Sequence, residues 1–91
     1  MIRRYEPNLK LVCEYAKNVI IDRHRLIYNY REDVYNDFKK MYPDCNVSSH
    51  YFTRHINKIF NTKVQLVSEH GNMIYIFVDA DGLRIRNHIE L

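Results

Sequence analysis

Residues 48–61 hold polar side chains whose types and spacing suit contacts with nucleic acid. On a helix, the spacing i, i+4, i+7, i+8 and i+11 places five of them on one face: His50, Arg54, Asn57, Lys58 and Asn61. Ser49 and Thr53 flank this face, and no acidic residue interrupts it, although the chain has 11 Asp and Glu. Because Arg and Lys contact phosphates or guanine and Asn pairs with adenine, the pattern predicts a nucleic-acid-binding face. The alternative is the ordinary polar side of a surface helix.

Weaker candidates follow in the next segment. Lys63, Gln65, His70 and Asn72 are placed to touch a nucleic-acid backbone or groove, whereas Glu69 beside them opposes phosphate binding. The remaining basic candidates are interpreted as solvated charges unless the fold gathers them: Arg3, Arg4, Arg23, Arg25, Arg84 and Arg86.

Metal binding and catalysis find little support in the sequence. Cys45, His50 and His55 are five residues apart, so on a helix they do not share a face, and we expect no metal site. Residues 79–82 (DADG) lack the other ligands of a calcium loop and are interpreted as a turn. The sequence has no phosphate-binding glycine loop, nucleophile motif or plausible carboxylate pair. We therefore expect a binding module without cofactor or enzymatic activity.

The totals fit one small intracellular domain. A chain of 91 residues makes a single domain, 1–91, and its net charge of +3 permits nucleic-acid binding without requiring it. Two cysteines are too few for a disulfide scaffold, and Cys13 is interpreted as a small core residue. No stretch approaches the roughly 20 apolar residues of a membrane span, so we expect a reducing intracellular location and no membrane partner.

Hydrophobic periodicity predicts three helices that position these side chains. The first covers 9–22, with one apolar face: Leu9, Val12, Cys13, Ala16, Val19 and Ile20. The second covers 30–41, with Asn29 and Glu32 as a capping box and a shared apolar face: Tyr30, Val34, Phe38 and Met41. The third covers 49–61, capped by Ser48 with Val47 and Phe52 as a hydrophobic staple, and its apolar stripe is Phe52, Ile56, Ile59 and Phe60.

The remaining segments have β character. Residues 24–28 are interpreted as a brief strand or an extended connection. Residues 64–78 predict a hairpin that turns at 69–72, and 83–86 predict a third strand or an ordered tail. Three helices followed by a hairpin indicate an α+β winged helix-turn-helix, with 49–61 as the recognition helix and 64–78 as the wing.

A family resemblance adds to this interpretation. The runs VYNDFKKMY (34–42), VSSHYF (47–52) and INKIF (56–60) resemble the pattern Y-x-x-F-K…S-x-x-x-F-x-x-x-I of phage and large-DNA-virus replicative helicases of the AAA+ superfamily 3 type. Residues 29–78 are similar to the C-terminal winged-helix domain of viral primase–helicases, and the Tyr-, Asn- and Ile-rich composition is similar to poxvirus proteins. The resemblance implies part of a hexameric helicase that engages DNA or replication partners in the host cytoplasm.

Three functions therefore remain open. The first is DNA binding in a replicative helicase, with no preference assigned among single-stranded, duplex and forked DNA. The second is a stand-alone viral repressor that binds DNA as a dimer, with Leu11 and Ile21 contributing to the dimer contact. The third is a module that docks replication proteins through an exposed apolar patch involving Leu11, Tyr15 or Tyr35.

Overall fold

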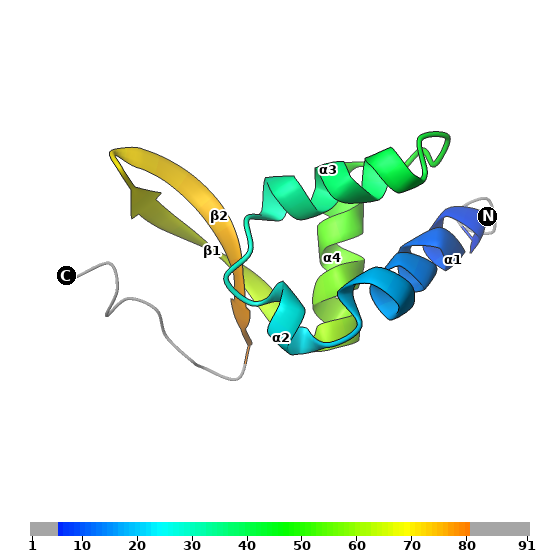
Figure 1. The fold of residues 1–91 in the computed structure, drawn as a ribbon, viewed down its shortest axis with the longest axis horizontal. Helices are drawn as coiled ribbons and strands as arrows, with labels where there is room; N and C mark the ends of the chain where they lie inside the picture. Colours follow the sequence, from blue (N-terminus) through cyan, green and yellow to red (C-terminus); the bar gives the residue numbers. More distant parts are fainter. Residues whose placement is uncertain (1–5, 81–91) are drawn as a thin grey trace.

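The computed structural model describes residues 6–80, and of Glu6 and Pro7 it describes the backbone alone. Within this range the chain is α+β: helices come first and an antiparallel two-stranded hairpin follows (Figure 1). The elements are α1 (Glu6–Tyr15), the π-helical η2 (Ala16–Ile20), α2 (Arg23–Leu26), α3 (Arg31–Met41), α4 (Ser49–Phe60), β1 (Thr62–Glu69) and β2 (Asn72–Asp79). The predicted α+β class is confirmed. The strand or ordered tail predicted at 83–86 lies outside the described residues.

The first helix departs from an α-helix before it ends. α1 continues directly into η2, and the Ile21 N–H donates to the Ala16 carbonyl at 2.8 Å, which closes a π-type turn. Ile21 has a φ of 70°, an outlier for a β-branched residue, and it stops the helix. The predicted end at residue 22 was therefore wrong by two residues.

Cys13 is exposed, so its assignment to the core was wrong. The inward face of α1 and η2 instead carries Val12, Tyr15 and Ala16, all at most 2% exposed. The Tyr15 ring packs edge-on against Phe38, with ring centres 5.5 Å apart. Because successive helical residues are about 100° apart, a face that buries this large ring turns Cys13 outward.

The segment between the first two long helices is also helical. Asp22 caps α2 by accepting a hydrogen bond from the Arg25 N–H at 3.1 Å. Because α2 covers Arg23–Leu26, the expectation of a strand or extended connection at 24–28 was wrong for residues 24–26. The connection that follows α2 pairs with β2. The Tyr28 N–H donates to the Phe77 carbonyl at 2.7 Å, and the Phe77 N–H donates to the Asn29 carbonyl at 3.0 Å. The connection 28–30 thus pairs with β2, although Tyr28 itself has a positive φ of 72°.

α3 matches its predicted bounds within one residue, but its predicted cap was wrong. Tyr30 occupies the N-cap position without a side-chain hydrogen bond. The Asn29 amide instead donates backwards to the Arg25 carbonyl at the end of α2. Because the Asn29 carbonyl already pairs with Phe77, this residue belongs to the connection between α2 and β2 rather than to the start of α3.

α4 has the termini that its sequence predicts. The Ser48 hydroxyl accepts from the Tyr51 N–H at 3.1 Å, and Val47 and Phe52 lie in the same buried cluster. At the other end, Asn61 adopts the left-handed conformation that commonly terminates helices, with φ 56° and ψ 53°. The Ser48 cap was predicted because capping chemistry is local, whereas Asn61 was expected to be the last helical residue rather than the cap.

The core lies where α1, α3, α4 and the base of β2 meet. The rings of Phe38 and Phe52 stack with centres 4.7 Å apart, and Phe77 is fully buried in the same cluster. Besides Cys13, three members of the predicted stripes are exposed: Tyr30, Met41 and Ile59. Each stands at the margin of its helical face, so the neighbouring elements cover the stripe centres but not these edges.

The hairpin confirms its predicted position and is slightly longer than expected. Its register runs from Thr62 opposite Asp79 to Glu69 opposite Asn72. The two turn residues, His70 and Gly71, both have positive φ, which is the requirement of a type I′ turn. Figure 1 shows the hairpin extending away from the helices, so its base joins the core and its outer half is open to solvent. No helix among the described residues is long and apolar enough to cross a membrane.

Candidate nucleic-acid interface

The candidate interface is the outer face of α4. Phe52 and Ile56 on the inner side are fully buried, and Phe52 contacts Phe38 of α3. The opposite side is exposed at four of the predicted positions: His50, Arg54, Lys58 and Asn61. The structure therefore brings the centre of the predicted face together on the surface.

One flank of the predicted face is turned inward. Thr53 is 8% exposed, and its hydroxyl oxygen is buried without a hydrogen-bond partner among the described residues. Ser49 is half-buried on the same side. Thr53 was therefore misassigned as a surface contact, because the sequence pattern does not show which edge of a polar stripe neighbouring elements will cover.

Asn57 and Asn61 contribute to the structure of the α4–β1 junction. The Asn57 side-chain oxygen accepts a hydrogen bond from the Thr62 hydroxyl at 2.9 Å. The Asn61 carbonyl accepts from the Ala80 N–H at 3.2 Å and so joins the two ends of the hairpin. Asn57 is half-buried by this arrangement, whereas Asn61 stays exposed.

The exposed face extends instead toward Tyr51 and His55, which the sequence-based prediction left out. Their rings meet edge-on with centres 4.4 Å apart, and both side chains are half-buried. Partial burial lowers the pKa of His55, and the positive charges of Lys58 and Arg54 lower it further. The i, i+4 spacing of the two rings, next to the basic residues, was the signal available in the sequence.

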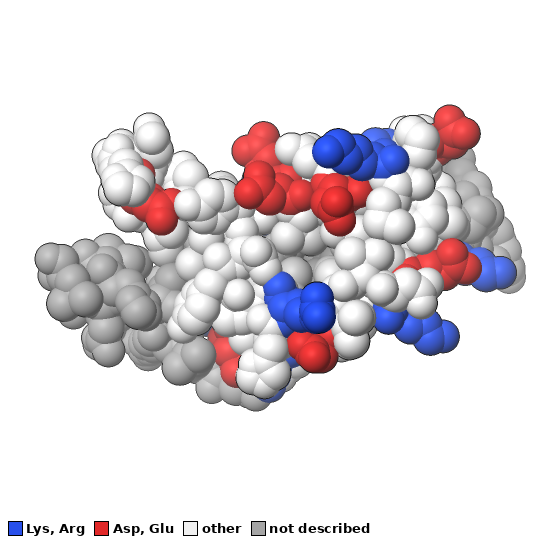
Figure 2. Space-filling view, viewed as in Figure 1, with Lys and Arg blue, Asp and Glu red and all other residues white. Residues whose placement is uncertain are grey.

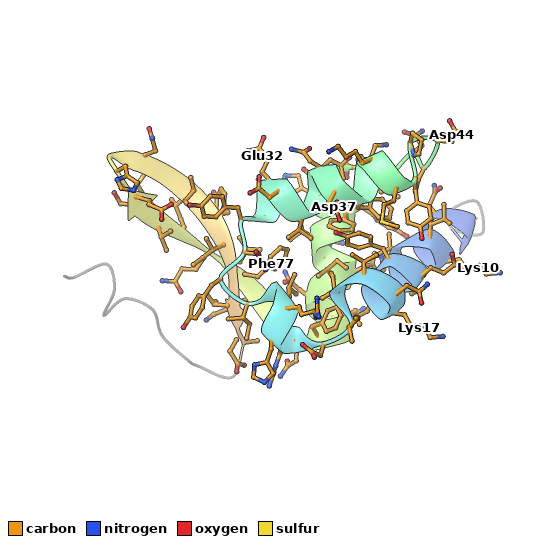
Figure 3. The ribbon with its side chains drawn as sticks, in the orientation of Figure 1. Lys10, Lys17, Glu32, Asp37, Asp44 and Phe77 are labelled. Carbon is orange, nitrogen blue, oxygen red and sulfur yellow. The ribbon has the colours of Figure 1, made fainter. Side chains whose placement is uncertain are left out.

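Charge is distributed unevenly between α3 and α4. α4 contains Arg54 and Lys58 and no acidic residue. α3 carries acidic and basic residues in equal number: Glu32, Asp33 and Asp37, with Arg31, Lys39 and Lys40. Figure 2 shows acidic side chains gathered over the first half of α3, and Figure 3 shows Glu32 and Asp37 on that helix. An anion approaching α4 therefore meets basic and neutral side chains on that helix, with the acidic ones on its neighbour.

The N-terminus of α4 adds backbone N–H groups to this surface. A shallow groove of about 480 Å³ beside it is lined by Asn46, Val47, Ser48 and Tyr51. Helix N-termini favour anions because their first N–H groups are free and the helix dipole is positive there. The groove and the Arg54 side of α4 thus offer donors to a phosphate backbone.

The hairpin candidates do not gather at one place. Lys63 is exposed at the base of β1, close in sequence to the end of α4, whereas His70 and Asn72 are exposed at the tip. With about 3.3 Å per strand residue, the tip lies roughly 23 Å beyond Lys63. Gln65 is half-buried, and Glu69 accepts a hydrogen bond from the Tyr30 hydroxyl.

The other basic candidates are divided by the fold. Arg23 forms an ion pair with Asp79 at 3.3 Å and donates to the Asn61 carbonyl at 3.4 Å, so it ties α2 to the base of the hairpin. Arg25 is exposed on α2. Four further candidates lie outside the described residues: Arg3, Arg4, Arg84 and Arg86.

The expected apolar docking patch on the first helices is not present as proposed. Tyr15 is 2% exposed, and its hydroxyl donates to Asp37 at 2.7 Å; burial and this acidic neighbour raise its pKa. Leu11 and Tyr35 are partly buried against the core, and the Tyr35 hydroxyl donates to the Val47 carbonyl. Ile21 is exposed, as are large apolar side chains on the hairpin. Within residues 6–80, no three His, Cys, Asp or Glu side chains are placed to hold a metal ion.

Comparisons with known proteins assign the chain to no family: no protein-family model, curated protein or solved structure matches it significantly.

Proposed function

We propose that this chain is a winged-helix module that binds nucleic acid through the outer face of α4. The observation that carries the proposal is the exposed set His50, Arg54 and Lys58 on a helix without acidic residues. α3, the connection 42–48 and α4 supply the helix-turn-helix, with α4 as the recognition helix. The hairpin supplies the wing, and the pairing of 28–30 with β2 supports the same architecture.

The nucleic acid that best suits this module is DNA. The resemblance of residues 29–78 to the C-terminal domain of viral primase–helicases supports a role at the edge of a replicative helicase, where single-stranded, duplex and forked DNA are all present. Arg54 and Lys58 contact phosphates, and the Tyr51–His55 ring pair stands beside them as an apolar contact for a sugar or base. We assign no catalytic step to the module.

The experiment is a fluorescence-anisotropy titration of labelled single-stranded, duplex and forked DNA at low and at physiological salt. We expect log K to fall with log salt by about 0.9 for each duplex phosphate neutralised. The double variant Arg54→Ala/Lys58→Ala is expected to weaken binding to all three DNAs.

A matched control makes this test specific. Lys10→Ala/Lys17→Ala removes the same charge from exposed positions on α1 and η2, which Figure 3 shows on the first helix. We expect it to retain most of the affinity. Equal losses of DNA affinity in the two double variants would show that binding depends on net charge and not on this face of α4. Unchanged binding in Arg54→Ala/Lys58→Ala would exclude this face of α4.

A further inference from the structure

Within residues 6–80, no strand pairs with the outer edge of β1. Among the described residues, β1 pairs with β2 alone. A two-residue turn makes Glu69 and Asn72 a hydrogen-bonded pair, so the alternation of an antiparallel ladder directs the backbone groups of Val64, Leu66 and Ser68 outward. The same alternation directs those of Phe77 outward on β2, where they do bond Tyr28 and Asn29. An uncovered strand edge is a template for another strand.

Apolar side chains accompany this open edge. Leu66 is 41% exposed, and its cross-strand partner Tyr75 is 43% exposed. Met73, two residues along β2 on the same face, is 60% exposed. Grouped apolar side chains on a protein surface commonly mark an interaction site. In monomeric proteins, charged side chains on an edge strand usually oppose pairing with a second copy. Here β1 carries one charge of each sign, Lys63 and Glu69, so its charges do not repel a second β1.

The edge is complementary to itself. When two β1 strands run antiparallel about a two-fold axis at Leu66, each Leu66 lies opposite the other, and Val64 lies opposite Ser68. In the same register Lys63 lies opposite Glu69 of the second copy, and this pair occurs twice. All outward-facing residues then meet as hydrogen-bonded pairs. Opposite charges directly across a sheet attract and like charges repel, so the charges select this register.

We propose that the chain forms a symmetric dimer in which β1 pairs with β1 of a second copy. The two hairpins then make one four-stranded antiparallel sheet in the order β2-β1-β1-β2. Leu66 and Tyr75 of both copies lie in one row across a face of this sheet, which covers apolar surface that the single chain exposes. The interface is isologous, as most homodimer interfaces are. The dimer is independent of nucleic-acid binding and uses no residue of the outer face of α4.

Charge reversal tests the register. Sedimentation velocity over a concentration series is expected to show a dimer for the full native chain. Lys63→Glu and Glu69→Lys each replace two attractive pairs by two repulsive ones, so each is expected to weaken the dimer about tenfold or more. The double variant Lys63→Glu/Glu69→Lys restores opposite charges and is expected to dimerise again. An equimolar mixture of the two single variants is expected to form a heterodimer, because one carries two acidic edge residues and the other two basic ones.

Three controls separate the register from other effects. Lys17→Glu makes the same charge change at an exposed position of η2 and is expected to leave the dimer intact. Tyr30→Phe removes the hydrogen bond to Glu69 without changing the edge charges, and is expected to do the same. Leu66→Pro removes an outward-facing N–H that the β1–β2 ladder does not use, so the hairpin is expected to fold, as judged by circular dichroism, and the dimer to be lost.

Two results would overturn the proposal. One is a native chain that stays monomeric at every concentration. The other is a dimer whose dissociation constant is unchanged in both single charge variants, because such a dimer uses another surface. Recovery in the mixture of the two single variants is the result that only the proposed register predicts.

Discussion

The guanidinium carbon of Arg31 lies 4.6 Å from the centre of the Tyr75 ring. Arg31 is the first residue of α3, and Tyr75 lies in the exposed half of β2. The preceding residue, Tyr30, donates a hydrogen bond to Glu69 near the end of β1. Two neighbouring residues at the start of α3 thus hold the two strands of the hairpin, and we infer that they set its angle to the helices.

This contact is expected to contribute measurably to stability. Arg31→Gln removes the cation over the ring, and we expect the free energy of unfolding to fall by about 0.5–1 kcal/mol. Tyr75→Leu should cost a similar amount, and the double variant should cost less than the sum of the two. Urea denaturation of the four proteins measures this coupling. Full additivity would show that the two side chains are adjacent without a stabilising interaction.

Loss of the α4 cap is expected to destabilise the fold. Ser48→Ala leaves the Tyr51 N–H without its acceptor at 3.1 Å, so we expect a loss of about 1 kcal/mol in the free energy of unfolding. Ser68→Ala, on the exposed part of β1, is the matched control and should change stability little. An equal effect of the two substitutions in thermal or urea unfolding would contradict the capping role.

Substitution of Thr53 is expected to stabilise the fold, in contrast to the substitution of Ser48. Its buried hydroxyl has no hydrogen-bond partner among the described residues, so it keeps a desolvation cost without a compensating bond. Thr53→Val preserves the branched shape and is expected to raise the free energy of unfolding by about 1 kcal/mol. DNA affinity should not change, because the side chain is covered. Weaker DNA binding by a stably folded Thr53→Val would return this residue to the interface.

His55 is expected to make stability depend on pH. Its folded-state pKa is lowered from 6.5 by burial and then by Lys58 and Arg54, so the unfolded chain binds the proton more readily. Its contribution is therefore fully present above the unfolded pKa and is lost as the pH falls through the folded pKa. Urea denaturation from pH 7.5 down to pH 5.5, about one unit on either side of the usual histidine pKa, should show this decline in the free energy of unfolding. His55→Gln should flatten it; an unchanged slope would assign the decline to other groups.

Most of the local structure could be predicted because its causes are local. Ser48 and the Gly71 turn each act within a few residues, so the sequence predicts the start of α4 and the turn of the hairpin. Asn61 was expected to be the last residue of the helix, and it is instead its αL C-cap. Asn29 shows the limit of such reasoning. Asn29 has the residue type and spacing of a helix cap. Its backbone instead pairs with Phe77, 48 positions later in the chain, so Asn29 belongs to the connection with β2.

The candidate site divides in the same way. The sequence by itself determined that α4 has a polar side without acidic residues, since helical periodicity and residue type are enough to define that side. Only the tertiary structure decided where the side ends. Packing of α4 against α1, α3 and β1 buries Thr53 and leaves Tyr51 and His55 at the surface. Burial depends on which neighbours cover each flank, and the position of α1 and α3 beside α4 is set by the tertiary fold.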